Sequence, residues 1–402
     1  MEKPSLDRKK ILFVAARLPY PTTEGHQIRT FGVLKQLAKY FDIHLISILR
    51  EEDNLESSSP LYALCQSVDV SLFKDSLLNK ATSVGLSLLR KSPIVIERYR
   101  SESLGRLFKD KIKEYAPDIV HFDLLTLAWL KEFVPAETPI VLNEHNVESN
   151  LVLQKAAIEK STLMKFILDR EARELTQFEK KACRSIQNVI TCSDDDLVDI
   201  EKFGARNVHC IPNAMDISEM SYSSELPRSK KIAFLGGMAW YPNRLGMQWF
   251  LDEVMPLIIQ KDSEVVLQVV GNPKPELTVS ESIKKNVNIL GFVDDLNVVM
   301  NEARVFIVPL HVGSGTRLKV IEGMAYGKCI VSTRKGSEGI NLTDNESVYF
   351  ADNATTFSDA VISCINDDEL CKTLGSTARA IAESTYDWNA LGLKMEKIYS
   401  AL

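Results

Sequence analysis

Short apolar runs alternate with helical stretches along most of this chain of 402 residues. Such runs are typical of strands in a parallel sheet that helices cover on both faces. In the first half they fall near residues 10–16, 42–48, 118–122, 139–143 and 188–192. The pattern then restarts, with runs near residues 231–235, 265–270, 287–290, 305–308 and 329–331. The sequence therefore predicts an α/β protein with two doubly wound sheets, and its longest helix is expected from about residue 149 to residue 185.

A linker between the two halves is expected at residues 213–230, which are rich in serine and show no apolar periodicity. We therefore place the first domain at residues 1–212 and the second at residues 213–384. Residues 385–402 are predicted to include an amphipathic helix, whose apolar side holds Leu391, Met395 and Ile398. Because doubly wound sheets bind ligands at the carboxyl ends of their strands, we expect the ligand site in a cleft between the domains.

Composition and charge argue against several classes of protein. The net charge of −6 speaks against nucleic-acid binding, and no apolar run approaches the roughly 20 residues needed to cross a bilayer. The seven cysteines are scattered without a Cys-x-x-Cys pair, which indicates reduced thiols in a cytoplasmic protein. Residues 15–25 lack the Gly-x-Gly-x-x-Gly turn of dinucleotide-binding dehydrogenases. No cluster of carboxylates and histidines suggests a metal site, so neither a metal nor a cofactor is expected.

One segment of this acidic protein is basic. Residues 74–113 hold ten Lys or Arg and four acidic residues, which gives a local charge of +6. Apolar clusters such as residues 81–89 lie in the same segment. Basic and apolar residues together are typical of a surface that contacts the inner face of a membrane, or of a cradle for a lipid-linked diphosphate. A solvated helix face is the alternative interpretation.

The most informative stretch for function lies at residues 313–322, between an apolar run and a helix expected at about residues 316–326. Glycines there let a ligand approach the backbone, and free N–H groups and the helix dipole favour an anion. Arg317 and Lys319 add two cations, and Glu322 can accept hydrogen bonds from sugar hydroxyls. Phosphate and ribose contacts this close together indicate a nucleotide site. A surface ion pair between Lys319 and Glu322 is the alternative.

The string Gly313-Ser-Gly-Thr-Arg-Leu-Lys-x-x-Glu322 resembles the donor motif of a subgroup of the retaining glycosyltransferases of family four, also called glycosyl transferases group 1. The resemblance covers nearly all of the chain, strongly at residues 230–340 and weakly at residues 50–115. It implies the GT-B fold, in which two Rossmann-like domains face each other across a cleft and the last helix packs back on the first domain. The other matching pieces are Pro19–Arg29, Pro139–Glu148, Val208–Asp216, Phe234–Asn243 and Gly291–Asp295.

The resemblance also implies roles for individual residues. The first domain would take a hydroxyl acceptor, and the second would bind a nucleotide-diphosphate sugar, with no metal ion involved. His145, Arg317 and Lys319 are the implied catalytic residues. Further candidates on the acceptor side are Arg29, His121, Glu144 and Glu148. The implied donor contacts are Gly25, Gly237, Asn243, Gly313, Ser314, Gly315, Thr316, Arg317, Lys319 and Glu322.

Two positions depart from the family's pattern. Many members carry an Arg and a Lys soon after the first strand of the second domain, where Met238 and Asn243 stand here. We therefore expect Arg317 and Lys319 to neutralise the diphosphate instead. Ser314 occupies the place of a glutamate that contacts the donor sugar, so the motif does not identify the sugar.

Other functions are compatible with the same motifs. A nucleotide-sugar 2-epimerase or a phosphorylase would have the same architecture. A non-catalytic nucleotide-sugar-binding protein is a third alternative, because Ser314 replaces the glutamate. The base and the sugar stay open, as does the acceptor, which could be a polysaccharide, a glycolipid, a natural product or a protein.

Overall fold

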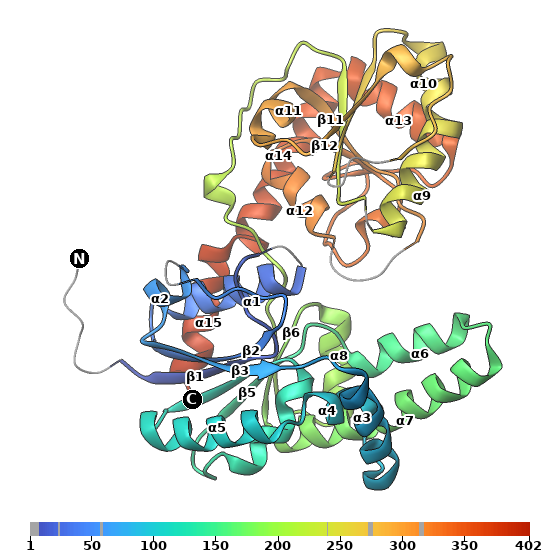
Figure 1. Ribbon diagram of the computed structural model, residues 1–402. Coiled ribbons are helices and arrows are strands. Elements are labelled where there is room, and N and C mark those ends of the chain that lie inside the picture. The colour runs from blue at the N-terminus through green and yellow to red at the C-terminus, as the bar shows by residue number, and fades with distance from the viewer. Residues whose placement is uncertain (1–7, 23–24, 57–58, 239, 272–275, 313–316) are drawn as a thin grey trace. The chain divides into compact units, whose positions relative to one another are not determined.

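Two units make up the chain, one of residues Met1–Pro212 with Gly392–Leu402 and one of residues Asn213–Leu391. Each contains one parallel sheet flanked by helices (Figure 1). The prediction of an α/β protein with two doubly wound sheets is therefore confirmed. The computed structural model describes residues 8–22, 25–56, 59–238, 240–271, 276–312 and 317–402.

The sheet of the first unit has seven parallel strands in the order β3-β2-β1-β4-β5-β6-β7. His121 and Phe122 are neighbours on β4, so their side chains point to opposite faces of the sheet. Phe122 packs on Phe108 of α5 (Glu102–Tyr115), and His121 packs on Tyr399 of α15 (Trp388–Ser400), so these helices cover opposite faces. The strands are β1 (Lys10–Ala15), β2 (Asp42–Arg50), β3 (Ser67–Phe73), β4 (Ile119–Asp123), β5 (Ile140–Asn143), β6 (Asn188–Thr191) and β7 (Asn207–Cys210).

Several helices of the first unit begin at a serine whose side chain accepts a hydrogen bond from the first turn, which satisfies a free backbone N–H. Ser76, Ser101, Ser161 and Ser193 cap α3 (Leu77–Arg90), α5, α7 (Thr162–Ser185) and α8 (Asp194–Phe203) in this way. The other helices of this unit are α1 (Gly25–Leu37), α2 (Leu61–Leu64), α4 (Ile94–Tyr99), the 3-10 segment Leu125–Phe133 and α6 (Glu148–Ile158).

The sheet of the second unit has six parallel strands in the order β10-β9-β8-β11-β12-β13. Alternate residues of β8 enter two different apolar cores, because neighbouring side chains of a strand point to opposite faces. Phe234 packs with residues of α9, α10 and α13, whereas Leu235 packs with residues of α11 and α12. The strands are β8 (Lys231–Leu235), β9 (Val266–Val270), β10 (Val287–Gly291), β11 (Ala303–Val308), β12 (Cys329–Ser332) and β13 (Tyr349–Phe350).

The helices of the second unit fill the connections between these strands. They are α9 (Tyr241–Trp249), a π-helical turn at Phe250–Val254, α10 (Met255–Lys261), α11 (Leu296–Glu302), α12 (Leu318–Ala325), α13 (Ala354–Asn366) and α14 (Asp368–Thr385), with 3-10 turns at Ile217–Glu219, Lys284–Asn286 and Lys335–Ser337. In the part of the chain that the structure describes, no helix is both long and apolar enough to cross a bilayer.

Some local expectations were wrong. The single helix expected at residues 149–185 is two helices, α6 and α7, because Ser161 caps a new helix start. Strands β3, β7 and β13 were not predicted, and each lies at an edge of its sheet, where partial exposure weakens the apolar pattern. In α15, Leu391 and Met395 are buried as expected. The third buried residue of this apolar side is Tyr399, whereas Ile398 is only partly buried.

Candidate functional site

The nucleotide-binding motif continues into α12 of the second unit. Strand β11 is buried along its whole length and lies before this helix in the chain. Parallel strands of doubly wound sheets place their ligands at this carboxyl end. The predicted contacts Gly313, Ser314, Gly315 and Thr316 lie outside the described residues. The described part of the motif is Arg317, Lys319 and Glu322.

Lys319 reaches back to the segment that follows the first strand of the unit. Its Nζ donates a hydrogen bond to Oδ1 of Asn243 and lies 4.6 Å from the centre of the Phe234 ring. A Cβ atom at Gly236 would lie 2.7 Å from both Lys319 Nζ and Asn243 Nδ2. Glycine at this position therefore leaves the space that the cation occupies. Asn243 is held in turn by the carbonyl of Gly237, which accepts from Nδ2 at 2.7 Å.

Burial moves the pKa values of both titratable groups of α12 towards neutrality. Burial, and then the charge of Arg317, lower the pKa of Lys319 to about 7. Burial raises the pKa of Glu322 to about 7, against the opposing effect of Lys319. A diphosphate beside Lys319 would favour its charged form and raise its pKa again. The charge of this site therefore depends on what binds there.

Arg317 is held at the same place by its own unit. Its side chain is 2% exposed, and its Nη2 donates to the carbonyl of Lys335 at 3.3 Å. The same nitrogen lies 3.7 Å from Oε2 of Glu338. The Trp240 ring centre lies 5.7 Å from the guanidinium carbon of Arg317 and 5.8 Å from Nζ of Lys319. Trp240 thus lies beside both cations, although it was not among the predicted site residues.

A second cluster, in the first unit, is organised by Asp123 at the carboxyl end of β4. Its Oδ1 accepts hydrogen bonds from Asn143 Nδ2 at 2.6 Å and from His145 Nε2 at 3.1 Å. Its Oδ2 accepts from the hydroxyl of Thr30 at 2.6 Å. Arg29 joins through Asn143, whose Oδ1 accepts from Arg29 Nη2 at 2.9 Å. The structure therefore brings two predicted site residues, Arg29 and His145, to one small polar cluster.

The contacts of Asp123 determine the charge state of this cluster. Burial by itself would raise the pKa of Asp123, but His145 and His121 hold it well below its ordinary value. An ionised Asp123 accepts from an N–H group, so we assign the proton of a neutral His145 to Nε2, which leaves Nδ1 as the acceptor. Asp123 and Asn143 were not among the predicted site residues. Their position at the carboxyl ends of β4 and β5 was the signal that could have found them.

The structure places His121 below the surface of the same cluster. Its side chain is fully buried, and burial lowers its pKa. The ring stacks on Phe13 at 4.1 Å between centres, and Nδ1 lies 2.6 Å from the hydroxyl of Tyr399. Its Nε2 lies 3.7 Å from Oδ1 of Asp123. In this position His121 supports Asp123 from within the core.

Glu144 and Glu148 have different surroundings. Glu144 is fully buried, and neither of its carboxylate oxygens has a hydrogen-bond partner among the described residues. The backbone N–H of Glu148 donates to Oε1 of Glu179 at 2.8 Å. Burial, and then the charge of Glu179, raise the pKa of Glu144 well above its ordinary value and that of Glu148 to about 7. The acceptor-side candidates therefore divide between two clusters.

Two predicted donor contacts are exposed glycines. A Cβ atom at Gly25, the first residue of α1, would meet nothing within 4 Å, so packing does not require glycine there. Gly237 is also exposed, and its carbonyl orients Asn243.

The residues that the structure describes include no group of three His, Cys, Asp or Glu side chains placed to hold a metal ion.

Two family profiles match parts of the chain. The profile of "Glycosyltransferase Family 4" matches residues 76–219, and that of "Glycosyl transferases group 1" matches residues 229–367. A Klebsiella pneumoniae protein, described as an uncharacterized 44.6 kDa protein in the cps region, is 22% identical over 391 residues, which cover 94% of this chain and 96% of that protein.

Solved structures share the fold at low sequence identity. Sucrose-phosphate synthase from Thermosynechococcus elongatus has a TM-score of 0.66 at 15% identity, over 98% of this chain and 99% of that one. Anabaena Alr3699/HepE, solved in complex with UDP, has a TM-score of 0.65 at 15% identity, over 98% and 100% of the chains. The matched profiles and this shared architecture together identify the protein as a glycosyltransferase with the GT-B fold.

Proposed function

We propose that this glycosyltransferase moves a sugar from a nucleotide-diphosphate sugar to a hydroxyl acceptor, with retention at the anomeric carbon and without a metal ion. The loop-and-helix motif that leads into α12 supports a nucleotide donor. Similarity to Alr3699/HepE, which has been solved with UDP and with UDP-glucose, supports the same donor class. A role in polysaccharide, glycolipid or other glycoconjugate biosynthesis fits such a reaction.

The observation that carries the proposal is the position of Lys319. Asn243 stands where the family's pattern commonly has a cation, and Lys319 Nζ reaches this place from α12. Arg317 lies nearby, over the ring of Trp240. We propose that these two cations replace the charge missing at Met238 and Asn243, and that they neutralise the donor diphosphate.

Stabilisation of the leaving group is the step that this arrangement serves. Negative charge develops on the diphosphate as its bond to the sugar breaks, and a well-aimed donor stabilises such a transition state by about 3 kcal/mol. Glu322, one turn along α12, is proposed to accept hydrogen bonds from the ribose hydroxyls. Its ionised form is the stronger acceptor. A pKa of about 7 leaves a large ionised fraction at neutral pH.

We propose that His145 acts at the sugar and acceptor. Asp123 orients its ring through Nε2, and Asn143 and Thr30 hold Asp123 in turn. Nδ1 is then the nitrogen that can accept a hydrogen bond from a hydroxyl group. This arrangement fixes the tautomer of His145, which a catalytic or positioning role requires.

We also propose a lipid-linked acceptor and a place at the cytoplasmic face of a membrane. The positive charge of residues 74–113 supports attraction to anionic lipid or to a lipid diphosphate. The seven cysteines are free thiols, as expected of proteins in a reducing compartment.

Donor binding gives the first test. A thermal-shift screen with UDP-, GDP-, ADP- and dTDP-sugars selects the donor, and titration calorimetry then compares the wild type with an Arg317→Ala, Lys319→Ala double variant. We expect a loss of affinity of roughly 100-fold, because the diphosphate would keep its charge without these partners. The control is Lys284→Ala, which removes an exposed cation of the same unit paired with Glu281 at 2.7 Å. A double variant within twofold of the wild type would overturn the assignment.

The products give the second test. Mass spectrometry of acceptor extracts incubated with the selected donor detects transfer, and the anomeric coupling constant of the product by NMR shows whether configuration is retained. Free nucleotide released without an acceptor would instead indicate a 2-epimerase. A requirement for inorganic phosphate would indicate a phosphorylase.

A further inference from the structure

An ordinary surface helix buries its apolar side and exposes its polar side. Helix α3 of the first unit does the opposite. Its buried residues are two serines, Ser83 and Ser87. The large apolar side chains face outward instead: Leu77 is 84% exposed, Leu78 72%, Leu88 61% and Leu89 81%. A helix that exposes leucines in this way leaves its apolar area without a partner in the described part of the chain.

Polar contacts hold α3 in this orientation. Arg170 of α7 donates from Nη1 to the hydroxyl of Ser87 and from Nη2 to its carbonyl, both at 2.9 Å. Turning the leucines inward would break both bonds from a guanidinium group, which are among the stronger hydrogen bonds of proteins. The outward direction of the leucines is therefore part of the folded structure.

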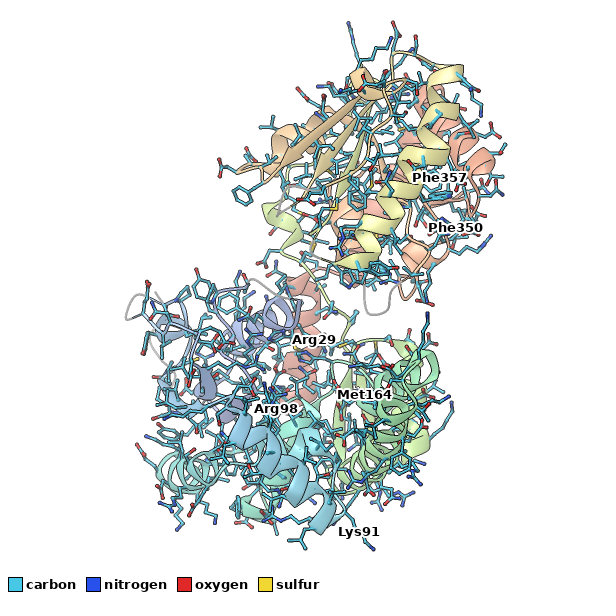
Figure 2. The ribbon with its side chains drawn as sticks, turned by 45° about the vertical axis from the view of Figure 1, so that its right-hand side comes forward. Arg29, Lys91, Arg98, Met164, Phe350 and Phe357 are labelled. Atoms are coloured by element: carbon cyan, nitrogen blue, oxygen red, sulfur yellow. The ribbon has the colours of Figure 1, made fainter. Side chains whose placement is uncertain are left out.

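The first two turns of α7 continue the apolar surface. Leu163 is 72% exposed, Met164 45%, Phe166 66% and Ile167 37%. Phe166 lies four residues, or about one helical turn, before Arg170, the residue that bonds to α3. Figure 2 labels Lys91, just after the end of α3, at the lower edge of the first unit, and Met164, near the start of α7, higher on the same unit.

The charges along these two segments have one sign. Residues 76–96 and 160–168 together hold five cations, Lys80, Arg90, Lys91, Lys160 and Lys165, and no carboxylate. Lys80 and Arg90 pair with flanking acids, at 3.2 and 2.8 Å. Among the described residues, Lys91, Lys160 and Lys165 have no ion-pair partner. The whole protein has a net charge of −6, but these unpaired lysines make this surface locally positive. Its charge is therefore complementary to that of an anionic surface.

Three of the four cations of α5, namely Arg106, Lys109 and Lys111, have partners outside α3 and α7. Lys111 pairs with Asp69 and Glu114, each at 3.0 Å, and Arg106 pairs with Glu102. Lys109 lies 3.9 Å from the centre of the Phe133 ring. Of the basic segment at residues 74–113, we therefore assign only α3 and its C-terminal end to the apolar and basic surface. This surface also includes the first two turns of α7, which the sequence did not indicate.

We propose that α3 and the first two turns of α7 dock on the surface of a bilayer that contains anionic lipid. The leucines and Phe166 would enter the boundary between headgroups and acyl chains, and the unpaired lysines would contact lipid phosphates. A bilayer fits better than a protein partner because the exposed apolar side chains are interspersed with cations. Carboxylates stand only at the ends of the two segments, at Asp75, Glu97, Glu159 and Asp169. This inference deepens the proposed membrane location but does not depend on glycosyl transfer.

Co-sedimentation with vesicles tests the proposal. Wild-type protein is mixed with vesicles of phosphatidylcholine alone or of phosphatidylcholine with phosphatidylglycerol, and is compared with a Leu88→Glu, Leu89→Glu variant. Both changes lie on exposed positions, so folding should not suffer. The control is Val198→Glu on α8, at a position that is 46% exposed. We expect binding to the anionic vesicles only, a loss of at least about tenfold in the leucine variant, and no loss in the control.

Three outcomes would overturn the proposal. Wild-type protein that stays in the supernatant with anionic vesicles excludes lipid docking, and equal binding by the leucine variant excludes this face. A dimer seen by light scattering that the leucine variant dissociates would show that a second copy covers the face instead. No nucleotide sugar is present in the assay, and donor affinity of the leucine variant should equal that of the wild type, so failure of this proposal is separable from failure of the proposed reaction.

Discussion

Donor binding should weaken as the pH rises above 7, because of Lys319. Burial and the charge of Arg317 lower the pKa of this lysine to about 7 in the free protein. A bound diphosphate stabilises the protonated form and raises the pKa again. Above pH 7, donor binding is therefore coupled to proton uptake by Lys319. A protein molecule with a neutral Lys319 must be protonated at this residue before or as it binds the donor. The sign follows from this: affinity is highest where Lys319 is already protonated and falls at higher pH.

The size of the effect follows from the two pKa values of α12. Lys319 is about half protonated at pH 7 and about 1% protonated at pH 9, which weakens binding about 50-fold. Over the same range Glu322 changes from about half ionised to almost fully ionised, which offsets about twofold of that loss. The expected net loss is about 25-fold, or about 2 kcal/mol.

Titration calorimetry at pH 7, 8 and 9 measures this loss. The diphosphate of a nucleotide sugar is fully ionised in this range, so at pH 8 pairs of buffers with different ionisation enthalpies report net proton uptake by the protein, about 0.8 from Lys319 and Glu322 together. Lys328→Met is the matched control, because burial also lowers the pKa of Lys328, to about 8. Lys328 precedes β12, at the amino end of the strand, away from the carboxyl edge. We expect this variant to keep the pH dependence and Lys319→Met to lose it.

An affinity that changes less than threefold between pH 7 and pH 9 without proton uptake would show that Lys319 does not carry this pH dependence. A pH dependence that disappears in Lys328→Met and persists in Lys319→Met would transfer the role to Lys328.

Three further changes test other parts of the structure. Glu148→Gln should raise the free energy of unfolding by about 3 kcal/mol at pH 8 and leave it unchanged at pH 4, because burial raises the pKa of Glu148 to about 7 and ionisation between these values opposes folding. Gly246→Ala should cost about 1–3 kcal/mol in urea unfolding, since its Cβ would lie 2.4 Å from a backbone oxygen, whereas Gly85→Ala, in open space on α3, should stabilise by about 0.5–1 kcal/mol. His145→Ala should lower kcat about 100-fold or more with donor affinity unchanged, and His209→Ala should change neither.

A specific result would contradict each of these three predictions. A stability of Glu148→Gln that exceeds the wild type equally at pH 4 and pH 8 would show that ionisation is not the cause. Equal stabilities of the two glycine variants would contradict the close packing at Gly246. A His145→Ala variant that lost donor affinity but kept its kcat would move this histidine from the reacting groups to donor binding.

Much of the fold was predictable because its signals are local. Central strands such as β1 and β11 are buried on both faces and therefore read as continuous apolar runs. Strand β3 reads Ser67-Val-Asp-Val-Ser-Leu-Phe73 and lies at an edge, where polar residues interrupt the run. The break at Ser161 was also missed, because helical periodicity on both sides of the break hides a cap that only the hydrogen bond to Met164 reveals.

The candidate site was predictable in part. Arg317, Lys319 and Glu322 were predicted because they stand within one short motif. Asp123 was not predicted, and its partners come from α1, β5 and the residues after β5. Contacts of this kind depend on how separate segments of the chain meet at one end of a sheet, and no local pattern records them.

The α/β class, the two sheets and the motif that leads into α12 can all be predicted from the sequence, because apolar runs, glycines and closely spaced cations are local features. How these residues act together depends on the folded structure. In the folded protein, Lys319 donates a hydrogen bond to Asn243, and Arg29 and His145 belong to the polar cluster around Asp123. The hydrogen bond from Arg170 to Ser87 holds α3 with its leucines outward. The physical reason is that burial and pairing, which determine charge and exposure, are properties of surroundings that distant segments supply.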